Sequence, residues 1–186
     1  MGRFLFLATV ALALISCNDS GTSAPEEVDA RALHDRILTF DAEMDYPPDF
    51  MEGAKDAGTE TPLQIDLPKM DRGGLDGALF VVWMVTEERD EAGYAGAIAR
   101  AENQKAALEK MFATYPDRIG LARTADEAEA LEAAGKHFAV AGMVNAYPLG
   151  PDLSRLGAWY DRGLRNISLT HVGHNQFADS SRPRRE

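Results

Sequence analysis

Cysteine, positive charge and long apolar runs are all scarce in this sequence. Only one cysteine is present among 186 residues, so no disulfide can form within the chain. Lysine and arginine number 19 against 30 aspartates and glutamates, and the net charge of −11 repels phosphate backbones, which argues against nucleic-acid binding. The hydrophobic fraction of 45% is typical of a globular protein and excludes a mainly disordered chain. The sequence therefore predicts one domain, or part of a larger one.

The N-terminal apolar run, from Phe4 to Ile15, is too short to cross a bilayer, which takes about 20 residues. It follows a single arginine and leads into Leu14-Ile15-Ser16-Cys17, which resembles a bacterial lipobox. We expect residues 1–17 to be a lipoprotein signal peptide with Cys17 as the lipidated residue. An ordinary signal peptide with a chance cysteine is the alternative. Asn18 favours the outer membrane, so the chain is predicted to lie at the periplasmic face of a bacterial membrane.

Residues 18–30 are polar and contain glycine, serine and proline, which predicts a flexible tether. From residue 31 the chain alternates strand and helix patterns. Residues 78–85 (ALFVVWMV) and 138–144 (FAVAGMV) are continuous apolar runs, typical of strands buried on both faces. Apolar stretches at 37–40, 119–122 and 166–170 predict three more strands. Apolar side chains at three- and four-residue spacing predict a helix over 91–115, and further helices are expected over 125–134, capped by Thr124, and over 152–162.

This order of elements predicts an α/β fold with a parallel sheet. No glycine-rich phosphate fingerprint follows the first strand, so a dinucleotide-binding fold has no support. The better match is a partial (β/α)8 TIM-type barrel with about five of its eight strands, since a full barrel takes about 250 residues. Such barrels carry their chemistry at the carboxyl ends of the strands. The polar residues at those ends are Glu43, Asp45, Asn145, Tyr147, His171 and His174.

Four short motifs, in order along the chain, resemble the N-terminal half of the membrane dipeptidase (renal dipeptidase-like) family of zinc peptidases. The resemblance covers residues 31–181, and residues 182–186 are expected to form an irregular tail. The motifs are Phe40-Asp41-Ala42-Glu43-Met44-Asp45, Gln64-Ile65-Asp66-Leu67-Pro68-Lys69-Met70, Gly142-Met143-Val144-Asn145-Ala146-Tyr147-Pro148 and Ser168-Leu169-Thr170-His171.

The resemblance implies a hydrolase that cleaves dipeptides with two zinc ions, which share a bridging carboxylate and hold a hydroxide. The first strand would supply a histidine and an aspartate two residues apart, on one face of the strand. Asp45 matches that aspartate, whereas Glu43 stands in place of the histidine. A carboxylate can bind zinc at about 2.0–2.2 Å, but two carboxylates suit harder ions such as Mg²⁺ or Mn²⁺ better. Two solvated carboxylates at a loop are the alternative.

The resemblance assigns two further positions. Val144 stands where the bridging glutamate belongs, and valine has no lone pair to offer a metal. His171 matches a histidine that contacts substrate, so we expect it to donate a hydrogen bond to the substrate or to the oxyanion formed on attack. A structural histidine at a strand end is the alternative. The remaining family ligands, two histidines on later strands, would fall beyond residue 186.

Two functions remain open at this point. The first is a lipid-anchored, zinc-dependent dipeptidase, with a dipeptide as substrate and the membrane as its partner. The second is a non-catalytic lipoprotein, a pseudoenzyme remnant without peptidase activity. A homodimer is compatible with both. Because the ligand positions Glu43 and Val144 depart from the family pattern, we expect this 186-residue chain to be inactive by itself.

Overall fold

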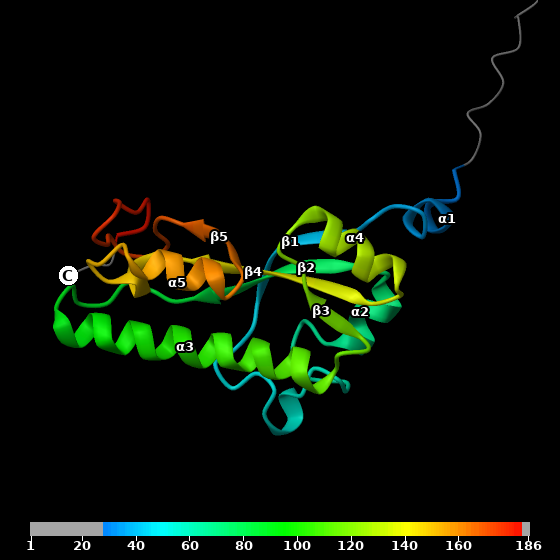
Figure 1. The fold of residues 1–186 in the computed structure, drawn as a ribbon, viewed down its shortest axis with the longest axis horizontal. Helices are drawn as coiled ribbons and strands as arrows, with labels where there is room; N and C mark the ends of the chain where they lie inside the picture. The colour runs from blue at the N-terminus through cyan, green and yellow to red at the C-terminus, as the bar shows by residue number, and fades with distance from the viewer. Residues whose placement is uncertain (1–27, 184–186) are drawn as a thin grey trace, which may run out of the picture.

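The computed structural model describes residues 28–183, which form a five-stranded sheet with helices on its faces (Figure 1). The predicted signal peptide with Cys17, most of the tether and the last three residues of the tail lie outside the described residues. The strands are β1 (Phe40–Asp45), β2 (Gly77–Trp83), β3 (Ile119–Leu121), β4 (His137–Val144) and β5 (Leu164–Ser168). The helices are α1 (Ala30–His34), α2 (Leu67–Gly73), α3 (Glu91–Thr114), α4 (Ala125–Ala133) and α5 (Arg155–Asp161). Two 3-10 turns, η1 and η2, span Gly53–Lys55 and Tyr147–Leu149.

All pairs of neighbouring strands are parallel, so the predicted parallel α/β sheet is confirmed. The predicted bounds of the first strand are wrong. The ladder with β2 begins where Phe40 pairs with Gly77, and the strand continues to Asp45. Ile37 and Leu38 lie before the strand and are about half exposed, at 51% and 50%. Their apolar character predicts strand residues, but the carboxylate-rich segment that follows forms the ladder instead.

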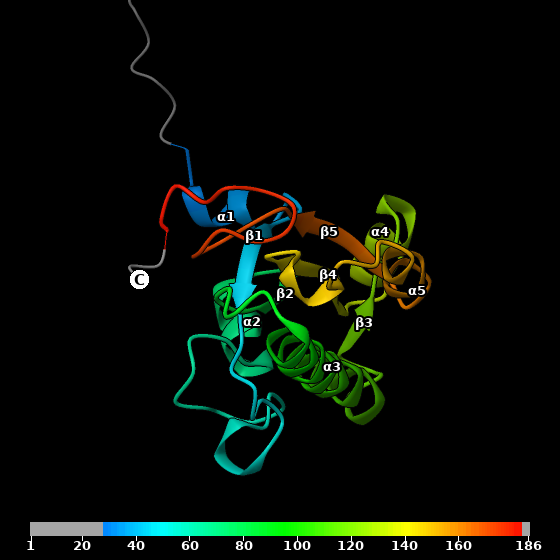
Figure 2. The same ribbon diagram turned by 90° about the vertical axis from the view of Figure 1, so that its left-hand side faces the viewer.

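The order of the strands in the sheet differs from their order in the chain. β2 pairs with β4 along its whole length, from Gly77–Phe138 to Trp83–Val144. The other edge of β4 is shared: β3 pairs with its first half and β5 with its second half. Four strands therefore form a continuous path, β1-β2-β4-β5, and β3 lies beside the amino-terminal half of β4. Figure 2 shows this arrangement, with β1 and β3 on opposite sides of β2 and β4.

Alternation along β2 and β4 divides the core between the two faces of the sheet. Ala78, Phe80, Ala139 and Ala141 pack with residues of α2 and α3 on one face. Figure 1 shows α3 running along this face. On the opposite face, a separate apolar cluster contains Leu79, Val81 and Val144, with Trp83 and Val140 packed against it. Near the amino ends of the strands, α4 covers this second face through contacts with Phe138 and Val140.

The helix boundaries follow the capping signals of the sequence. Thr124 Oγ1 accepts a hydrogen bond from the Glu127 amide at 3.1 Å, as predicted for the start of α4. Asp90 caps α3 in the same way, accepting from the Gly93 amide at 2.8 Å. α3 ends at Thr114, two residues before Pro116. No helix within residues 28–183 is both long and apolar enough to span a membrane.

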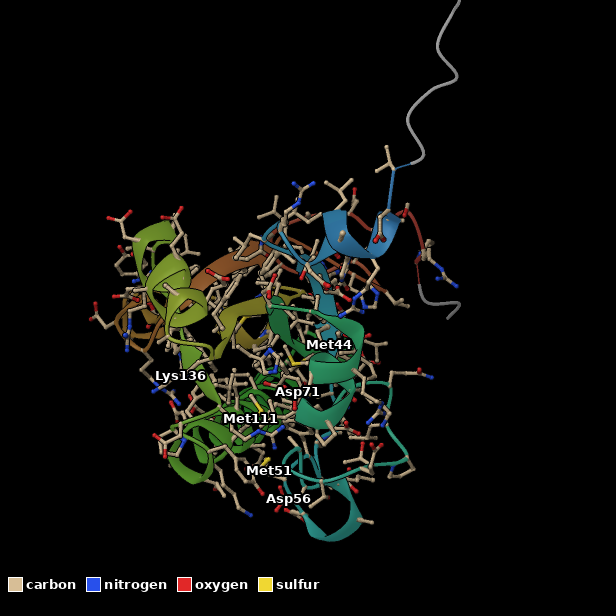
Figure 3. All side chains as sticks on the ribbon, turned by 90° about the vertical axis from the view of Figure 1, so that its right-hand side faces the viewer. Met44, Met51, Asp56, Asp71, Met111 and Lys136 are labelled. Carbon is tan, nitrogen blue, oxygen red and sulfur yellow. The ribbon has the colours of Figure 1, made fainter. Side chains whose placement is uncertain are left out.

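The segment between β1 and α2 joins the core although its composition is polar and glycine-rich. Tyr46 and Met51 are 1% and 3% exposed. The Tyr46 hydroxyl donates to the carbonyl oxygen of Gln104 on α3 at 3.1 Å. Met51 packs in the same cluster as Met111 of α3 (Figure 3). This segment therefore closes the end of the core beneath β1. Its polar, glycine-rich composition gave no sign of that role.

Candidate functional site

The carboxyl ends of β1, β2, β4 and β5 lie at one edge of the sheet because these strands are parallel. One row of paired residues crosses the sheet near this edge: Asp45 pairs with Val81, Val81 with Gly142, and Gly142 with Asn166. Two residues further along the strands, a second row joins Trp83, Val144 and Ser168. Asp45 and Val144 therefore belong to the same face of the sheet, on strands separated by β2. Neighbouring strands lie about 4.8 Å apart, so roughly two strand spacings separate the two backbones.

Glu43 and Asp45 are both exposed at the end of β1. The ladder with β2 is irregular between Asp41 and Met44, so Glu43 lies within a bulge. The Asp41 carboxylate accepts a hydrogen bond from the Glu43 amide at 2.9 Å and holds this bulge locally. The two carboxylates share an exposed strand end, and the one shared face that their two-residue spacing predicts stays a prediction because of the bulge.

Val144 is buried in the apolar cluster with Leu79 and Val81, with 8% of its surface exposed. It therefore packs as a core residue at the position where the resemblance calls for a bridging glutamate. Within residues 28–183, no three histidine, cysteine, aspartate or glutamate side chains come close enough together to hold a metal ion. A zinc site needs at least three protein ligands. Glu43, Asp45 and Val144 consequently do not fit a two-zinc centre, and we derive no catalytic step through zinc from them.

The four histidines are spread over the molecule. His171 is exposed in the loop after β5, and its carbonyl oxygen accepts a hydrogen bond from the Ser180 hydroxyl. His174 accepts from the Ser180 amide at its Nδ1, at 3.0 Å. His137 lies 2.8 Å from Asp71 and His34 contacts the carbonyl oxygens at the end of α2, both away from the carboxyl ends. Only His171 and His174 therefore lie near the predicted site.

A buried pair of asparagines organises the carboxyl ends of the strands. Asn145 follows β4 directly, is fully buried and has a φ of +88°. Its side-chain amide donates to the Met84 carbonyl at 3.0 Å and to the Thr86 hydroxyl at 3.1 Å, after β2. Its backbone amide donates to Ser168 Oγ at 3.0 Å, at the end of β5. One residue, through its side chain and its backbone amide, thus ties together the ends of three strands.

Asn175 extends this network into the loop that contains His171. Its side-chain amide donates to Asn145 Oδ1 at 2.8 Å and to the Leu169 carbonyl at 2.6 Å. Its own oxygen accepts from the amides of Phe177 and Ala178 at 2.8 and 3.0 Å. No role of Asn175 can be predicted from the sequence, because an isolated loop asparagine has no periodic signal. Asn145 is the residue of this network that the sequence could indicate, since asparagine adopts a positive φ more often than most residues.

Tyr147 fixes the next turn of the same edge. Its hydroxyl donates to the Glu88 carbonyl, and its ring packs against Tyr94 with centroids 5.3 Å apart. Burial, together with the nearby Glu87 carboxylate, raises the pKa of Tyr147 to about 12, so the phenol stays protonated at neutral pH. Gln176 donates to the carbonyls of Tyr147 and Gly150 at 3.2 and 2.8 Å. Buried polar contacts therefore hold the loops around the carboxyl ends of the strands.

A family model described as membrane dipeptidase (peptidase family M19) matches residues 27–186. The chain belongs to the membrane dipeptidase family. Among curated relatives, dipeptidase verJ of Clonostachys rogersoniana is 25% identical over 122 residues, which are 62% of this chain and 31% of the relative. Dipeptidase aclJ of Aspergillus oryzae is 27% identical over 124 residues, covering 64% and 29% of the two chains. The matched part of the chain spans under a third of the length of these relatives.

Solved structures of the family share the fold. The probable dipeptidase PvdM from Pseudomonas aeruginosa superposes with a TM-score of 0.78 and 35% identity, over 82% of this chain and 39% of that one. A metallo peptidase from Rhodobacter sphaeroides, crystallised with a phosphinate mimic of the dipeptide L-Ala-D-Ala, gives a TM-score of 0.59 at 22% identity, over 74% and 48%. At that identity the likeness shows the fold alone. The family resemblance and the fold class predicted from the sequence are both confirmed.

Proposed function

We propose that the site at the carboxyl ends of β1, β4 and β5 recognises dipeptides and is part of a zinc-dependent dipeptidase. The family match over residues 27–186 carries this proposal. The bacterial structure that was crystallised with a dipeptide mimic is consistent with it. Within this chain, Asp45 and His171 are the exposed polar residues that the resemblance places at this edge.

His171 is the residue we assign to substrate. It stands at the start of the loop that Asn175 fastens to Asn145, so its backbone position is set by buried hydrogen bonds. The imidazole is free to point to solvent because the residue is exposed. In this proposal a ring N–H donates to a carbonyl or carboxylate oxygen of the dipeptide.

Zinc, where it is bound in this family, would polarise the scissile carbonyl and activate a water molecule. The described residues offer two carboxylates and a buried valine for that task, which is a poor match to the borderline-soft zinc ion. This observation favours a second candidate function, dipeptide binding without hydrolysis. The two candidates share the ligand and differ in turnover.

One experiment separates them. The purified chain is incubated with Zn²⁺ and a panel of dipeptides, and binding is followed by calorimetry while free amino acids are measured over time. We expect saturable binding that His171→Ala weakens at least tenfold, and hydrolysis no faster than in buffer. His34→Ala, which changes a histidine far from the site, is the matched control. Hydrolysis that a chelator and Asp45→Ala both abolish would instead establish the zinc-dependent enzyme. Absence of binding would refute dipeptide recognition.

We also propose that the chain is a lipoprotein at the periplasmic face of a bacterial membrane, the outer membrane being favoured by Asn18. The support is the apolar run ending in Leu14-Ile15-Ser16-Cys17. Mass spectrometry of the membrane fraction should give a mature chain that starts at a lipid-modified Cys17. Cys17→Ser should block both the modification and membrane retention. A mature N-terminus elsewhere, with an unmodified Cys17, would contradict this proposal.

A further inference from the structure

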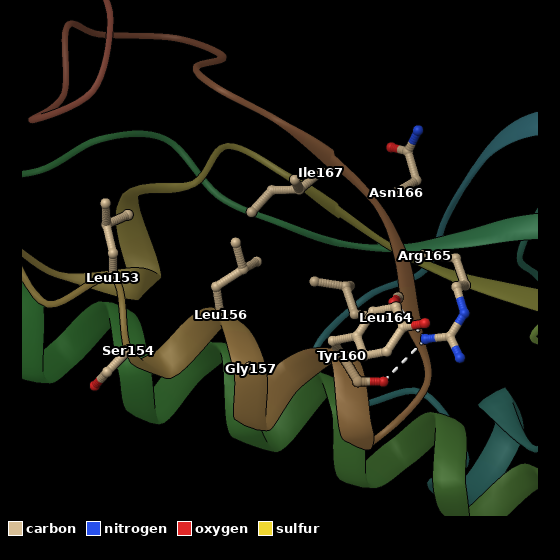
Figure 4. A pocket seen from close by; sticks show the side chains of 9 residues that line it. All are labelled: Leu153, Ser154, Leu156, Gly157, Tyr160, Leu164, Arg165, Asn166 and Ile167. Atoms are coloured by element: carbon tan, nitrogen blue, oxygen red, sulfur yellow. Dashed lines mark hydrogen bonds between the residues drawn. The ribbon is translucent and has the colours of Figure 1, made fainter.

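The loop after β5 begins on a strand that is itself held in place. Arg165 of β5 donates to the carbonyl oxygen of Tyr160 on α5 at 2.9 Å (Figure 4). Beyond the strand, the Thr86 amide donates to the Val172 carbonyl oxygen at 2.9 Å, and the Thr86 hydroxyl donates to the carbonyl oxygen of Gly173 at 3.3 Å. The base of the loop is therefore attached to α5 and to the segment that follows β2.

Ser180 closes this loop by contacting both of its histidines. Although it lies in a loop, Ser180 is only 8% exposed. Its hydroxyl donates to the His171 carbonyl oxygen, and its backbone amide donates to His174 Nδ1 at 3.0 Å. A path of two hydrogen bonds therefore runs from the imidazole of His174 through Ser180 to the backbone of His171.

The contact with Ser180 determines which nitrogen carries the proton of the neutral His174 ring. A backbone amide can only donate, so Nδ1 must accept with a lone pair, and the ring proton is on Nε2. The Asp179 carboxylate oxygen Oδ1 lies 3.2 Å from the same Nδ1. A carboxylate can only accept, so this pair forms a hydrogen bond only when Nδ1 carries a proton. Two adjacent residues thus offer Nδ1 opposite partners, Ser180 for the neutral ring and Asp179 for the protonated ring.

We propose that His174 is a positioning residue for the dipeptide site and makes substrate binding depend on pH. The neutral ring holds the Ser180 amide, and the Ser180 hydroxyl in turn holds the carbonyl oxygen of His171. When the ring is protonated, two N–H groups face each other at Ser180, and the ring pairs with Asp179 instead. His171 then loses the contact that fixes its backbone. This inference rests on the proposed function, in which His171 contacts the substrate.

Charged groups surround the loop, and Asp179 is the carboxylate at ion-pair distance from His174 among the described residues. The other titratable side chains of the loop and of the segments packed against it are His171 and Arg182 in the loop, Glu87, Glu88, Arg89 and Asp90 after β2, and Tyr147 after β4. Arg89 donates to the Asn175 carbonyl oxygen at 3.4 Å. Histidine is the type of side chain that changes charge between about pH 5 and pH 8. An experiment in this range must therefore separate His174 from His171.

Nuclear magnetic resonance tests the coupling without any substrate. The purified chain is labelled with ¹⁵N and ¹³C, and its signals are followed from pH 8 to pH 5.5. We expect His174 to carry its proton on Nε2 at pH 8, and the Ser180 amide and His171 carbonyl signals to shift in step with its titration. In His174→Asn the side-chain oxygen can accept from Ser180 without titrating, so the Ser180 amide should keep its position. A proton on Nδ1 at pH 8, or a Ser180 amide that does not follow the ring, would overturn the proposal.

Dipeptide binding tests the consequence for the site. Calorimetry measures the affinity at pH 8 and pH 5.5 for the tightest-binding dipeptide of a panel. His174→Leu removes the acceptor, so we expect it to bind about fivefold more weakly than the unmodified chain at pH 8, which is the effect of one typical hydrogen bond. His174→Asn should match the unmodified chain at pH 8 and bind about fivefold more tightly than it at pH 5.5. His34→Asn, which changes a histidine of α1, is the matched control and should follow the unmodified chain at both values.

Ser180→Ala separates the two contacts. It removes the hydroxyl that holds His171 and keeps the amide that His174 holds. It should therefore bind as weakly as His174→Leu at pH 8, while the amide at position 180 still follows the ring. An equal pH dependence of binding in the unmodified chain and in His174→Asn would overturn the inference and leave the proposed function intact. A chain that binds no dipeptide, although its Ser180 amide follows His174, would instead refute the proposed function and with it the role of His174 in binding.

Discussion

Asn175 donates a hydrogen bond from its side-chain amide to Asn145 Oδ1 at 2.8 Å, and both residues are almost completely buried. The contact joins the end of β4 to the loop after β5. It contributes more to stability than an exposed hydrogen bond does, because neither buried amide can bond to water if its partner is lost. The shape of the candidate site therefore depends on a polar pair in the interior.

The first prediction concerns Asn145. Asn145→Ala removes a donor and an acceptor from buried partners, so we expect it to lower the free energy of unfolding by about 2–4 kcal/mol. Asn145→Gly should be about 1 kcal/mol less damaging, since glycine tolerates the φ of +88°. Urea unfolding measures both. Asn103→Ala, at an exposed position of α3, should change stability by less than about 0.5 kcal/mol. Equal effects at positions 145 and 103 would contradict the role of the network.

The second prediction concerns the approach of β2 to β4. A Cβ atom on Gly77 would lie 2.3 Å from the ring of Phe138. That ring is 3% exposed and stacks on Phe40 with centroids 5.8 Å apart, so it has little room to move. We expect Gly77→Ala to destabilise the chain by about 1–3 kcal/mol. Gly96→Ala is the control, because nothing lies within 4 Å of its added Cβ and helix α3 should gain about 0.5–1 kcal/mol. A shared sign for the two changes in thermal denaturation would refute this explanation.

The third prediction concerns pH. Burial of the Asp66 carboxylate acts to raise its pKa, but hydrogen bonds from Lys69 and Thr61 outweigh burial and lower the pKa to about 2. The unfolded chain has the ordinary value near 3.8, so it binds the proton first as pH falls. The stabilisation, about 2 kcal/mol, is thus present above about pH 4 and is lost between about pH 4 and pH 2.

Asp66→Asn removes that titration. Its unfolding free energy should depend less on pH than that of the unmodified chain across this acid range. Asp126→Asn, at an exposed position in the first turn of α4, should retain the full dependence. Identical pH profiles for the unmodified chain and the Asp66 variant would exclude the effect.

The fourth prediction concerns Val144→Glu, which introduces the glutamate that the family resemblance implies at this position. In Val144→Glu the new carboxyl group replaces an apolar side chain beside Leu79 and Val81, and burial raises the pKa of such a group. The folded state then holds the proton more tightly than the unfolded state, so stability falls as pH rises from about 4. We expect Val144→Glu to match Val144→Gln near pH 4 and to be about 1–3 kcal/mol less stable at pH 8. Zinc should not recover the loss, and recovery by zinc would show that metal ligands surround this position.

Much of the fold could be predicted from the sequence because its signals are local. The apolar runs of β2 and β4, the stripe of α3 and the Thr124 cap each depend on neighbouring residues, and each is confirmed. The place of β3 could not be predicted, since no pattern within a strand specifies its partner. The first strand was misplaced because Ile37 and Leu38 are apolar yet about half exposed, so their composition indicates burial that the described residues do not provide.

The candidate site was predicted less completely. Glu43 and Asp45 lie together at the end of β1, but the bulge between Asp41 and Met44 interrupts the regular alternation from which their shared face was predicted. The contacts of Asn175 depend on a return of the chain over the ends of other strands, and that path has no periodic signature. Asp45 and Val144 lie in two of the motifs that resemble the family, and they share one face of the sheet. Whether Asp45 binds a metal depends on further ligands, which these motifs do not specify.

The shared edge of β4 also determines how the sheet assembles. β1 and β2 are joined by one connection, and β3, β4 and β5 follow one another closely along the chain, so each group can pair at low loop-closure entropy. The ladder between β2 and β4 must close across α3, β3 and α4, and it joins the two groups. Contacts that bridge long stretches of chain form slowly. We therefore expect the most extensive ladder of the described sheet to form last, so that β1 and β2 stay without their main partner until β4 has been synthesised.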